Sequence, residues 1–344
     1  MTDSIALSQV NDSPDLASIQ QTIRRSAPKE DLERWMKLRP AIAYRDLALD
    51  WLGILVMLAI VSQVQTWWMY AIAFLVIGFF QYALFILGHD AIHSALHPNR
   101  KINDLTSKWL IHGPMFMGFE DGRRSHLEHH RHLATDQDPD RYLHTLANKN
   151  SRLQFLLFCT GLATFGKTVL KVTPFGKLLN QSKSKTPEPV SHKVNSALSS
   201  YAIQRIPVFV IQPLLIGLFL ALGLPWWAYL LLWIAPIYFC VFLPDEIRAF
   251  CDHAILVYPD CAADSKRLVT FTPSWLEAII FSPHNMSYHA EHHLWAAIPY
   301  YNLPKAHQFV RLRSEVTIRK SYVQFLLKVL STLPLNNSYE AVRR

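Results

Sequence analysis

Charge is missing from two long stretches of this 344-residue chain. Residues 51–88 and residues 206–244 contain no Asp, Glu, Lys or Arg. Each stretch has about 38 residues and would span about 57 Å as a helix, at about 1.5 Å per residue. The hydrocarbon core of a bilayer is about 30 Å thick, so each stretch is long enough to cross it twice. We therefore predict an all-α membrane protein with four transmembrane helices in two hairpins.

Several sequence motifs are also missing. The four cysteines include no C-x-x-C pair, which excludes a ferredoxin-like cluster and favours free thiols over a disulfide framework. The chain contains no H-P-G-G haem motif of a fused cytochrome b5 domain and no H-E-x-x-H zinc-protease pattern. The first 20 residues lack the apolar segment of a signal peptide.

Basic residues set the expected orientation. The net charge is +8, and seven Lys and Arg residues lie between Arg24 and Arg45, before the first apolar stretch. Cytoplasmic loops carry such an excess, so we expect both termini in the cytoplasm and no nucleic-acid binding. Residues up to about Lys29 are polar and are expected to be disordered. The predicted segments are an N-terminal tail with an amphipathic helix (1–46), hairpin 1 (47–88), a cytoplasmic region (89–200), hairpin 2 (201–244) and a second cytoplasmic region (245–344).

Histidine is the abundant functional residue, with 16 copies. Eight of them form three clusters at helical spacing: His89 and His93; His126, His129 and His130; His289, His292 and His293. Residues at i, i+3 and i+4 leave one face of a helix, and neutral imidazole is the commonest metal ligand. A solvated histidine-rich face is the alternative for any single cluster. Three clusters, with His253 as a ninth imidazole, would supply two metal ions, although spacing alone does not name the metal.

The remaining histidines fall off this spacing. His97, His132 and His284 are expected to make surface or hydrogen-bonding contacts, and His112, His144, His192 and His307 are not expected to be ligands. Glu128 and Glu291 occupy the same slot in two clusters, two residues along a helix from a ligand, and should face away from it.

The clusters resemble the three histidine boxes of the membrane fatty acid desaturase and hydroxylase superfamily. The matching motifs are H-D-A-I-H at 89–93, H-L-E-H-H at 126–130 with D-P-D at 138–140, and H-A-E-H-H at 289–293. The resemblance covers residues 89–307 and the four-span layout. Asn285 and the N-L-P-x-x-H motif from Asn302 look most like acyl-lipid desaturases.

This resemblance implies a non-haem di-iron site that uses O2 and two electrons. The ligands it implies are His89, His93, His126, His129, His130, His253, His289, His292 and His293. Groups that could orient these ligands are Asp90, Asp138, Asp140, Asn285 and Asp252, which stands where many relatives have Glu; the first three could instead cap helices or form turns. We expect the histidine boxes in a cytoplasmic helical cap that holds the iron pair.

The function implied is O2-dependent desaturation of a fatty acyl chain on a lipid. Because the chain lacks its own electron-transfer motif, electrons should come from a separate donor of the ferredoxin or cytochrome b5 type. A carotenoid ketolase or hydroxylase, or a lipid hydroxylase, could use the same di-iron site. A non-catalytic metal transporter would need ionisable residues within its spans, and both apolar stretches lack Asp, Glu, Lys and Arg.

Overall fold

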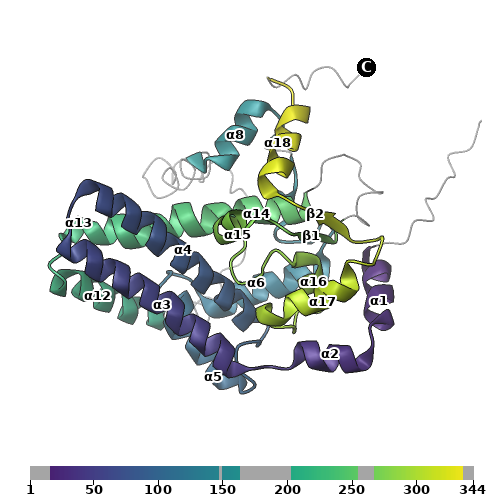
Figure 1. Ribbon diagram of the computed structural model, residues 1–344, viewed down its shortest axis with the longest axis horizontal. Coiled ribbons are helices and arrows are strands. Elements are labelled where there is room, and N and C mark those ends of the chain that lie inside the picture. Colours follow the sequence, from purple (N-terminus) through teal and green to yellow (C-terminus); the bar gives the residue numbers. More distant parts are fainter. Residues whose placement is uncertain (1–15, 147–148, 163–202, 255–266, 336–344) are drawn as a thin grey trace, which may run out of the picture.

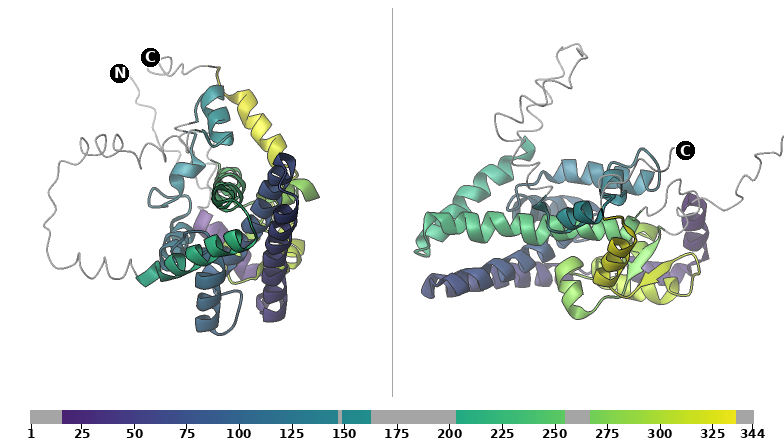
Figure 2. Two further views of the ribbon diagram at one scale, coloured as in Figure 1. Left: turned by 90° about the vertical axis from the view of Figure 1, so that its left-hand side faces the viewer. Right: turned by 90° about the horizontal axis from the view of Figure 1, so that it is seen from above.

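The computed structural model describes residues 16–146, 149–162, 203–254 and 267–335, and most of them are helical. Two views show the long helices extending together from one end of the molecule and the shorter elements gathered at the other (Figures 1 and 2). The helices are α1 (Leu16–Ser26), α2 (Lys29–Met36), α3 (Pro40–Gln63), α4 (Trp67–Ile92), α5 (Arg100–Ser107), η1 (Lys108–His112), α6 (Phe119–His132), α7 (Arg141–His144), α8 (Arg152–Cys159), α12 (Ile206–Ala221), α13 (Trp226–Tyr229), η2 (Leu230–Ile234), η3 (Ile237–Phe242), α14 (Leu243–His253), α15 (Trp275–Phe281), α16 (His289–Leu294), η5 (Tyr300–Asn302), α17 (Leu303–Val310) and α18 (Tyr322–Thr332).

Four helical segments are long and apolar enough to cross a membrane, as predicted. They cover residues 29–63, 67–92, 203–221 and 226–253, with mean hydropathies between 1.6 and 2.2. Trp67 and Trp226, which begin the second and fourth segments, are 82% and 72% exposed. Exposed Trp at the end of an apolar helix suits the interface between a bilayer and water.

The fourth segment is longer than expected. The sequence predicts an end near Leu243, but α13, η2, η3 and α14 follow one another as a single helical segment to His253. Two π-helical stretches flank Pro236, which has no N–H to donate to the preceding turn. The helix therefore carries His253 on its last turn.

The long helices pack closely against one another. Gly78 of α4 faces Cys240 of η3, where an added Cβ would lie 2.4 Å from the cysteine Cβ. Trp51 of α3 stacks on Trp233 of η2 at 5.8 Å. The outward faces keep large apolar side chains exposed, among them Phe209 at 71%. Such surfaces are normally covered by lipid or by a partner.

The N-terminal region differs from the prediction of disorder up to about Lys29. Residues 16–26 form α1, whose Leu16, Ile19 and Ile23 are buried in a core shared with Leu294 of α16. These three side chains are spaced i, i+3 and i+7, which is the apolar stripe of an amphipathic helix. Burial of this stripe outweighs the polar composition of the segment.

Two short strands are the one departure from a helical fold among the described residues. β1 (Val269–Phe271) and β2 (Thr317–Arg319) pair in parallel, with Val269 opposite Thr317. The Phe271 N–H also donates to the Ser287 carbonyl at 2.9 Å. The strand pair thereby anchors the segment that leads into α16.

Candidate metal centre

Four helices bring the three histidine clusters and His253 to one place. His89 lies in the last turn of α4 and His93 follows as its C-cap, while α6 carries the second cluster and α16 the third. His253 is the last residue of α14. Because of the helical period, the histidines of each cluster project from the same face of their helix.

Five imidazoles form the first set, which we call site 1. Their ligand atoms all lie within 4.8 Å of one another. The Nε2 atom of His130 is 3.0 Å from Nε2 of His126 and 3.0 Å from Nε2 of His292. Every cluster contributes to this set, which comprises His89, His93, His126, His130 and His292.

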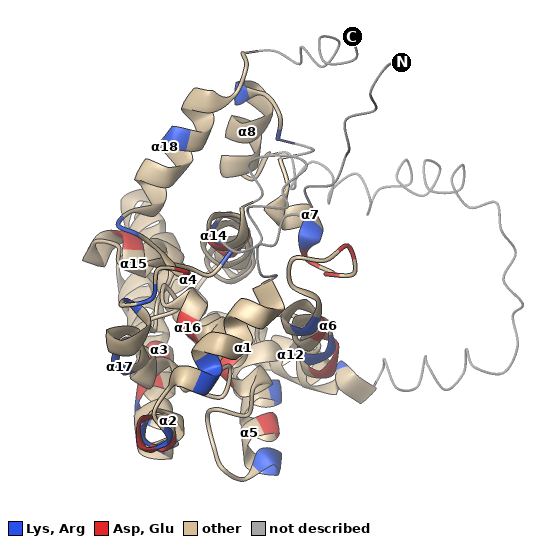
Figure 3. Ribbon diagram, turned by 90° about the vertical axis from the view of Figure 1, so that its right-hand side faces the viewer, with Lys and Arg blue, Asp and Glu red and all other residues tan. Residues whose placement is uncertain are grey.

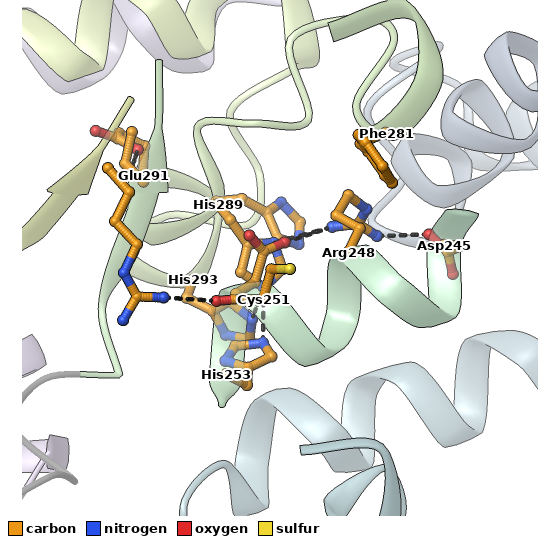
Figure 4. A network of polar contacts seen from close by, with 12 residues as sticks. Asp245, Arg248, Cys251, His253, Phe281, His289, Glu291 and His293 are labelled. Carbon is orange, nitrogen blue, oxygen red and sulfur yellow. Dashed lines mark hydrogen bonds and ion pairs between the residues drawn. The ribbon is translucent and has the colours of Figure 1, made fainter. Parts of the chain in front are cut away.

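The other four predicted ligands form site 2. Ligand atoms of His129, His253 and His293 lie within 4.8 Å of one another. The Nε2 atom of His289 is 2.7 Å from Nε2 of His253 and 3.0 Å from Nε2 of His293. Figure 4 shows the His253, His289 and His293 side chains drawn together beside α14. The structure therefore divides the nine predicted imidazoles into five and four.

The geometry and protonation of these imidazoles fit metal ions. Two nitrogens that each lie about 2.0–2.1 Å from one metal are about 3 Å apart, as found here. Burial lowers the pKa of His93 to about 4 and of His130 to about 2. It also holds the pKa of His292 and His293 well below the usual value. These four rings are thus neutral at pH 7, which is the state that binds a metal.

One carboxylate contacts a predicted ligand directly. His129 Nδ1 donates to Asp138 Oδ1 at 2.9 Å, and Asp140 lies 3.9 Å from the same nitrogen. Asp138 follows Thr135 in a turn that leads into α7. A carboxylate on the outer nitrogen of an imidazole fixes its tautomer and leaves the other nitrogen for a metal.

The other candidate orienting groups lie farther from the imidazole nitrogens. Asp252 is 3.6 Å from His289 Nδ1. Asp90 accepts a hydrogen bond from the Tyr300 N–H at 2.8 Å, and the Asn285 amide faces the Tyr300 carbonyl at 3.4 Å. Asp90 and Asn285 thus contact the chain after the third cluster rather than a ligand.

Arg248 is a buried residue that the sequence analysis missed. Its guanidinium donates to Asp245 at 2.7 Å and to Asp252 at 2.9 Å, and it lies 3.5 Å from His289 Nδ1 (Figure 4). The sequence pattern that could have indicated this network is an arginine with Asp at i−3 and i+4 on the same helix. This ion-pair network holds α14 against the third cluster.

The remaining histidines are held in other contacts, with one exception. His132 lies 3.2 Å from Glu128, His284 lies 2.9 Å from Asp50, and His307 Nδ1 lies 2.7 Å from Glu291. His97 accepts from the Asn99 N–H and His112 lies 3.0 Å from the Ser107 hydroxyl. His192 lies outside the described residues. The exception is His144, whose ring is 4.6 Å from that of His253.

A cavity of about 200 Å³ opens beside the imidazoles. Site 1 contributes His89 and His126 to its wall, and site 2 contributes His129, His253 and His289. Apolar side chains cover much of the remaining wall: Phe85, Ile92, Met117, Leu143 and Ala249. The arrangement can bring an apolar segment of a ligand to both sites at once.

Comparisons with known proteins identify the family. The fatty acid desaturase family model matches residues 65–320, which is more than half of the chain. The chain is 25% identical to an sn-1 acyl-lipid omega-3 desaturase (ferredoxin) of Nostoc sp. (strain 36), over 74% of this chain and 70% of that protein. It is also 25% identical to a dihydrorhizobitoxine desaturase of Bradyrhizobium elkanii, over 72% of this chain and 69% of that protein. The chain belongs to the fatty acid desaturase family, within the membrane desaturase and hydroxylase superfamily.

Proposed function

We propose that this protein is a di-iron desaturase that introduces a double bond into the fatty acyl chain of a membrane lipid. The reaction removes two hydrogens from adjacent carbons: R–CH2–CH2–R′ + O2 + 2e⁻ + 2H⁺ gives R–CH=CH–R′ + 2H2O. One observation carries the proposal. The five imidazoles of site 1 and the four of site 2 meet beside a cavity whose wall is partly apolar and also includes Asp140, Asp245 and Arg248, at the end of helices long enough to cross a membrane.

The cavity would hold the reacting part of the acyl chain. Its volume of about 200 Å³ is below the about 300–1,000 Å³ of pockets that enclose whole drug-sized ligands, so it suits a short segment of chain. Phe85 and Leu143 would hold the methylenes by apolar contact. Two bound irons would supply the O2 activation that breaks a C–H bond. The carbon attacked would be chosen by how the walls position the chain.

We further propose the arrangement of the protein around this centre. All nine predicted histidines are ligands, and Asp138 orients His129 through the hydrogen bond at 2.9 Å. The apolar helices pair as two hairpins, with both termini and the histidine boxes on the cytoplasmic side as one helical cap. Support for this orientation is the basic segment between Arg24 and Arg45, which precedes the first apolar helix.

Electrons would come from a separate acidic donor, of the ferredoxin or cytochrome b5 type. Figure 3 shows Lys and Arg residues on α1, α2, α5 and α7, with Asp and Glu residues among them on α2 and α5. Arg24 joins this surface to site 2, because its guanidinium donates to the His293 and Leu294 carbonyls at 2.8 and 2.6 Å. Charge attraction weakens as salt screens it, so reduction should slow with rising ionic strength. A rate that does not change with salt would contradict this part of the proposal.

The test of the function is the lipid profile of cells that express the protein with a ferredoxin system, measured by gas chromatography with mass detection. The inactive control is His292→Ala, and the matched active control is His132→Ala, which changes a partly exposed histidine paired with Glu128. A new unsaturated acyl chain, absent from the His292→Ala cells, is the expected result. A new hydroxy acid would instead assign a lipid hydroxylase. A changed carotenoid with unchanged acyl chains would assign a ketolase or hydroxylase.

A further inference from the structure

A tenth histidine lies against site 2 without a hydrogen-bonding role. His144 ends α7 and is 1% exposed. Neither of its ring nitrogens has a hydrogen-bond partner within the part of the chain that the structure describes. A buried polar group left unpaired costs about 1–3 kcal/mol, so such groups normally have a partner or a ligand.

The position of His144 points toward a metal. Its ring centroid is 4.6 Å from that of His253 and 5.5 Å from that of His129. Ring pairs within site 2 have similar separations, such as 4.5 Å for His253 and His289 and 5.0 Å for His129 and His253. The same ring lines the cavity that both sites border. His144 therefore lies beside two of the four imidazoles of site 2, at separations close to those between rings of that site.

Asp138 connects His144 to site 2. Oδ1 of Asp138 accepts from His129 Nδ1 at 2.9 Å, and Oδ2 lies 3.6 Å from His144 Nδ1. That second oxygen is buried and otherwise unpaired among the described residues. Ligand atoms of His129, Asp138 and His144 all lie within 4.8 Å of one another. One carboxylate can thus face the outer nitrogens of two imidazoles and leave both Nε2 atoms for a metal.

We propose that His144 is a fifth imidazole ligand of the metal at site 2, oriented with His129 by Asp138. The inference rests on the two-metal centre of the proposed function. With His144, each site would have five imidazole ligands, because site 1 already has five and site 2 has four without His144.

The experiment compares iron binding in the purified full-length wild type, His144→Ala and the control His132→Ala. Each protein is loaded with ⁵⁷Fe, its iron content is measured, and its Mössbauer spectrum is recorded. We expect two irons per wild-type chain. In His144→Ala we expect one iron to be lost, or to leave to a chelator at least about tenfold faster, with the site 1 signal unchanged. Two irons with unchanged signals in His144→Ala would overturn the inference, even if activity fell, because His144 would then only line the cavity.

A second variant keeps the test decisive if His144→Ala folds poorly. His144→Cys places a thiolate at the same position, and thiolates are ligands for divalent metals. With Co²⁺ bound, a coordinated thiolate adds a sulfur-to-metal charge-transfer band that the wild type lacks. Absence of this band in a Cys variant that binds Co²⁺ would count against the inference. A wild type without two metals would refute the two-metal centre itself, which separates the two failures.

Discussion

The hydrogen bond between Asp138 and His129 gives a prediction whose magnitude follows from the structure. The two side chains are 1% and 4% exposed, and the Nδ1–Oδ1 distance is 2.9 Å. Burial is the largest single influence on Asp138 and acts to raise its pKa, but the hydrogen bonds from His129 and from the Asp140 N–H and the neighbouring imidazoles together outweigh it, and the pKa falls below its usual value. The carboxylate is therefore ionised at neutral pH and accepts a charge-assisted hydrogen bond.

Replacing this carboxylate should weaken metal binding at site 2. Loss of an outer partner of a metal-binding histidine costs about 10–100-fold in affinity. A hydrogen bond to a charged group is worth about 1.5–3 kcal/mol, which is about 10–150-fold at about 1.4 kcal/mol per decade. The two estimates agree. Asp138→Asn, which keeps a carbonyl acceptor, should fall at the lower end of the range, and Asp138→Ala should fall at the upper end.

The assay is a chelator competition that reports the affinity of each iron in the purified protein. Asp136→Asn is the matched control. Asp136 lies two residues before Asp138 and its side chain is 93% exposed, so this substitution removes the same charge at the surface. Equal affinities at site 2 for Asp138→Asn and Asp136→Asn would refute the orienting role of Asp138. Equal weakening at both sites would show that the change disturbs the fold instead.

Two further predictions concern stability. Gly78→Ala should destabilise the protein by about 1–3 kcal/mol in thermal unfolding, because the new Cβ would lie 2.4 Å from the Cβ of Cys240. Gly217→Ala is the control and should be neutral or stabilising, because no atom lies within 4 Å of its new Cβ. Equal changes in stability for the two variants would contradict the close packing at Gly78. Burial lowers the pKa of His112 to about 4, so its neutral form stabilises the fold above the unfolded pKa of about 6.5, and this contribution is lost as the pH falls toward 4. Between pH 7 and pH 5, the free energy of unfolding should therefore fall by about 2 kcal/mol less in His112→Asn than in the wild type. The measurement uses metal-free protein, with His132→Asn as the control. An unchanged pH dependence in His112→Asn would contradict this prediction.

Local patterns in the sequence were enough to predict the four apolar helices and the helical presentation of the histidine clusters. A long stretch without charged residues indicates a membrane-spanning helix, and histidines spaced i, i+3 and i+4 indicate one face of a helix. The resemblance to the desaturase superfamily rested on the same boxes, and the family match confirms it. These features depend on residues close together in the chain, which is why they can be read from it.

Features that depend on contacts between distant segments were not predicted. Residues 16–26 look polar, and the side chains that bury Ile23 come from the other end of the chain. Arg248 resembles a surface residue until α14 extends to His253 and places it against His289. His144 fits no ligand spacing, because α7 brings it to site 2 by tertiary packing alone.

The most direct test of the central claim is the fate of O2 and hydrogen in a single reaction. The purified protein, reduced by ferredoxin, is given ¹⁸O2 and a lipid whose acyl methylenes carry deuterium. For a desaturase we predict a double bond, loss of one deuterium from each of the two adjacent carbons, and no ¹⁸O in the lipid. An ¹⁸O-labelled hydroxyl on the chain, with no double bond, would contradict the assignment of this protein as a desaturase.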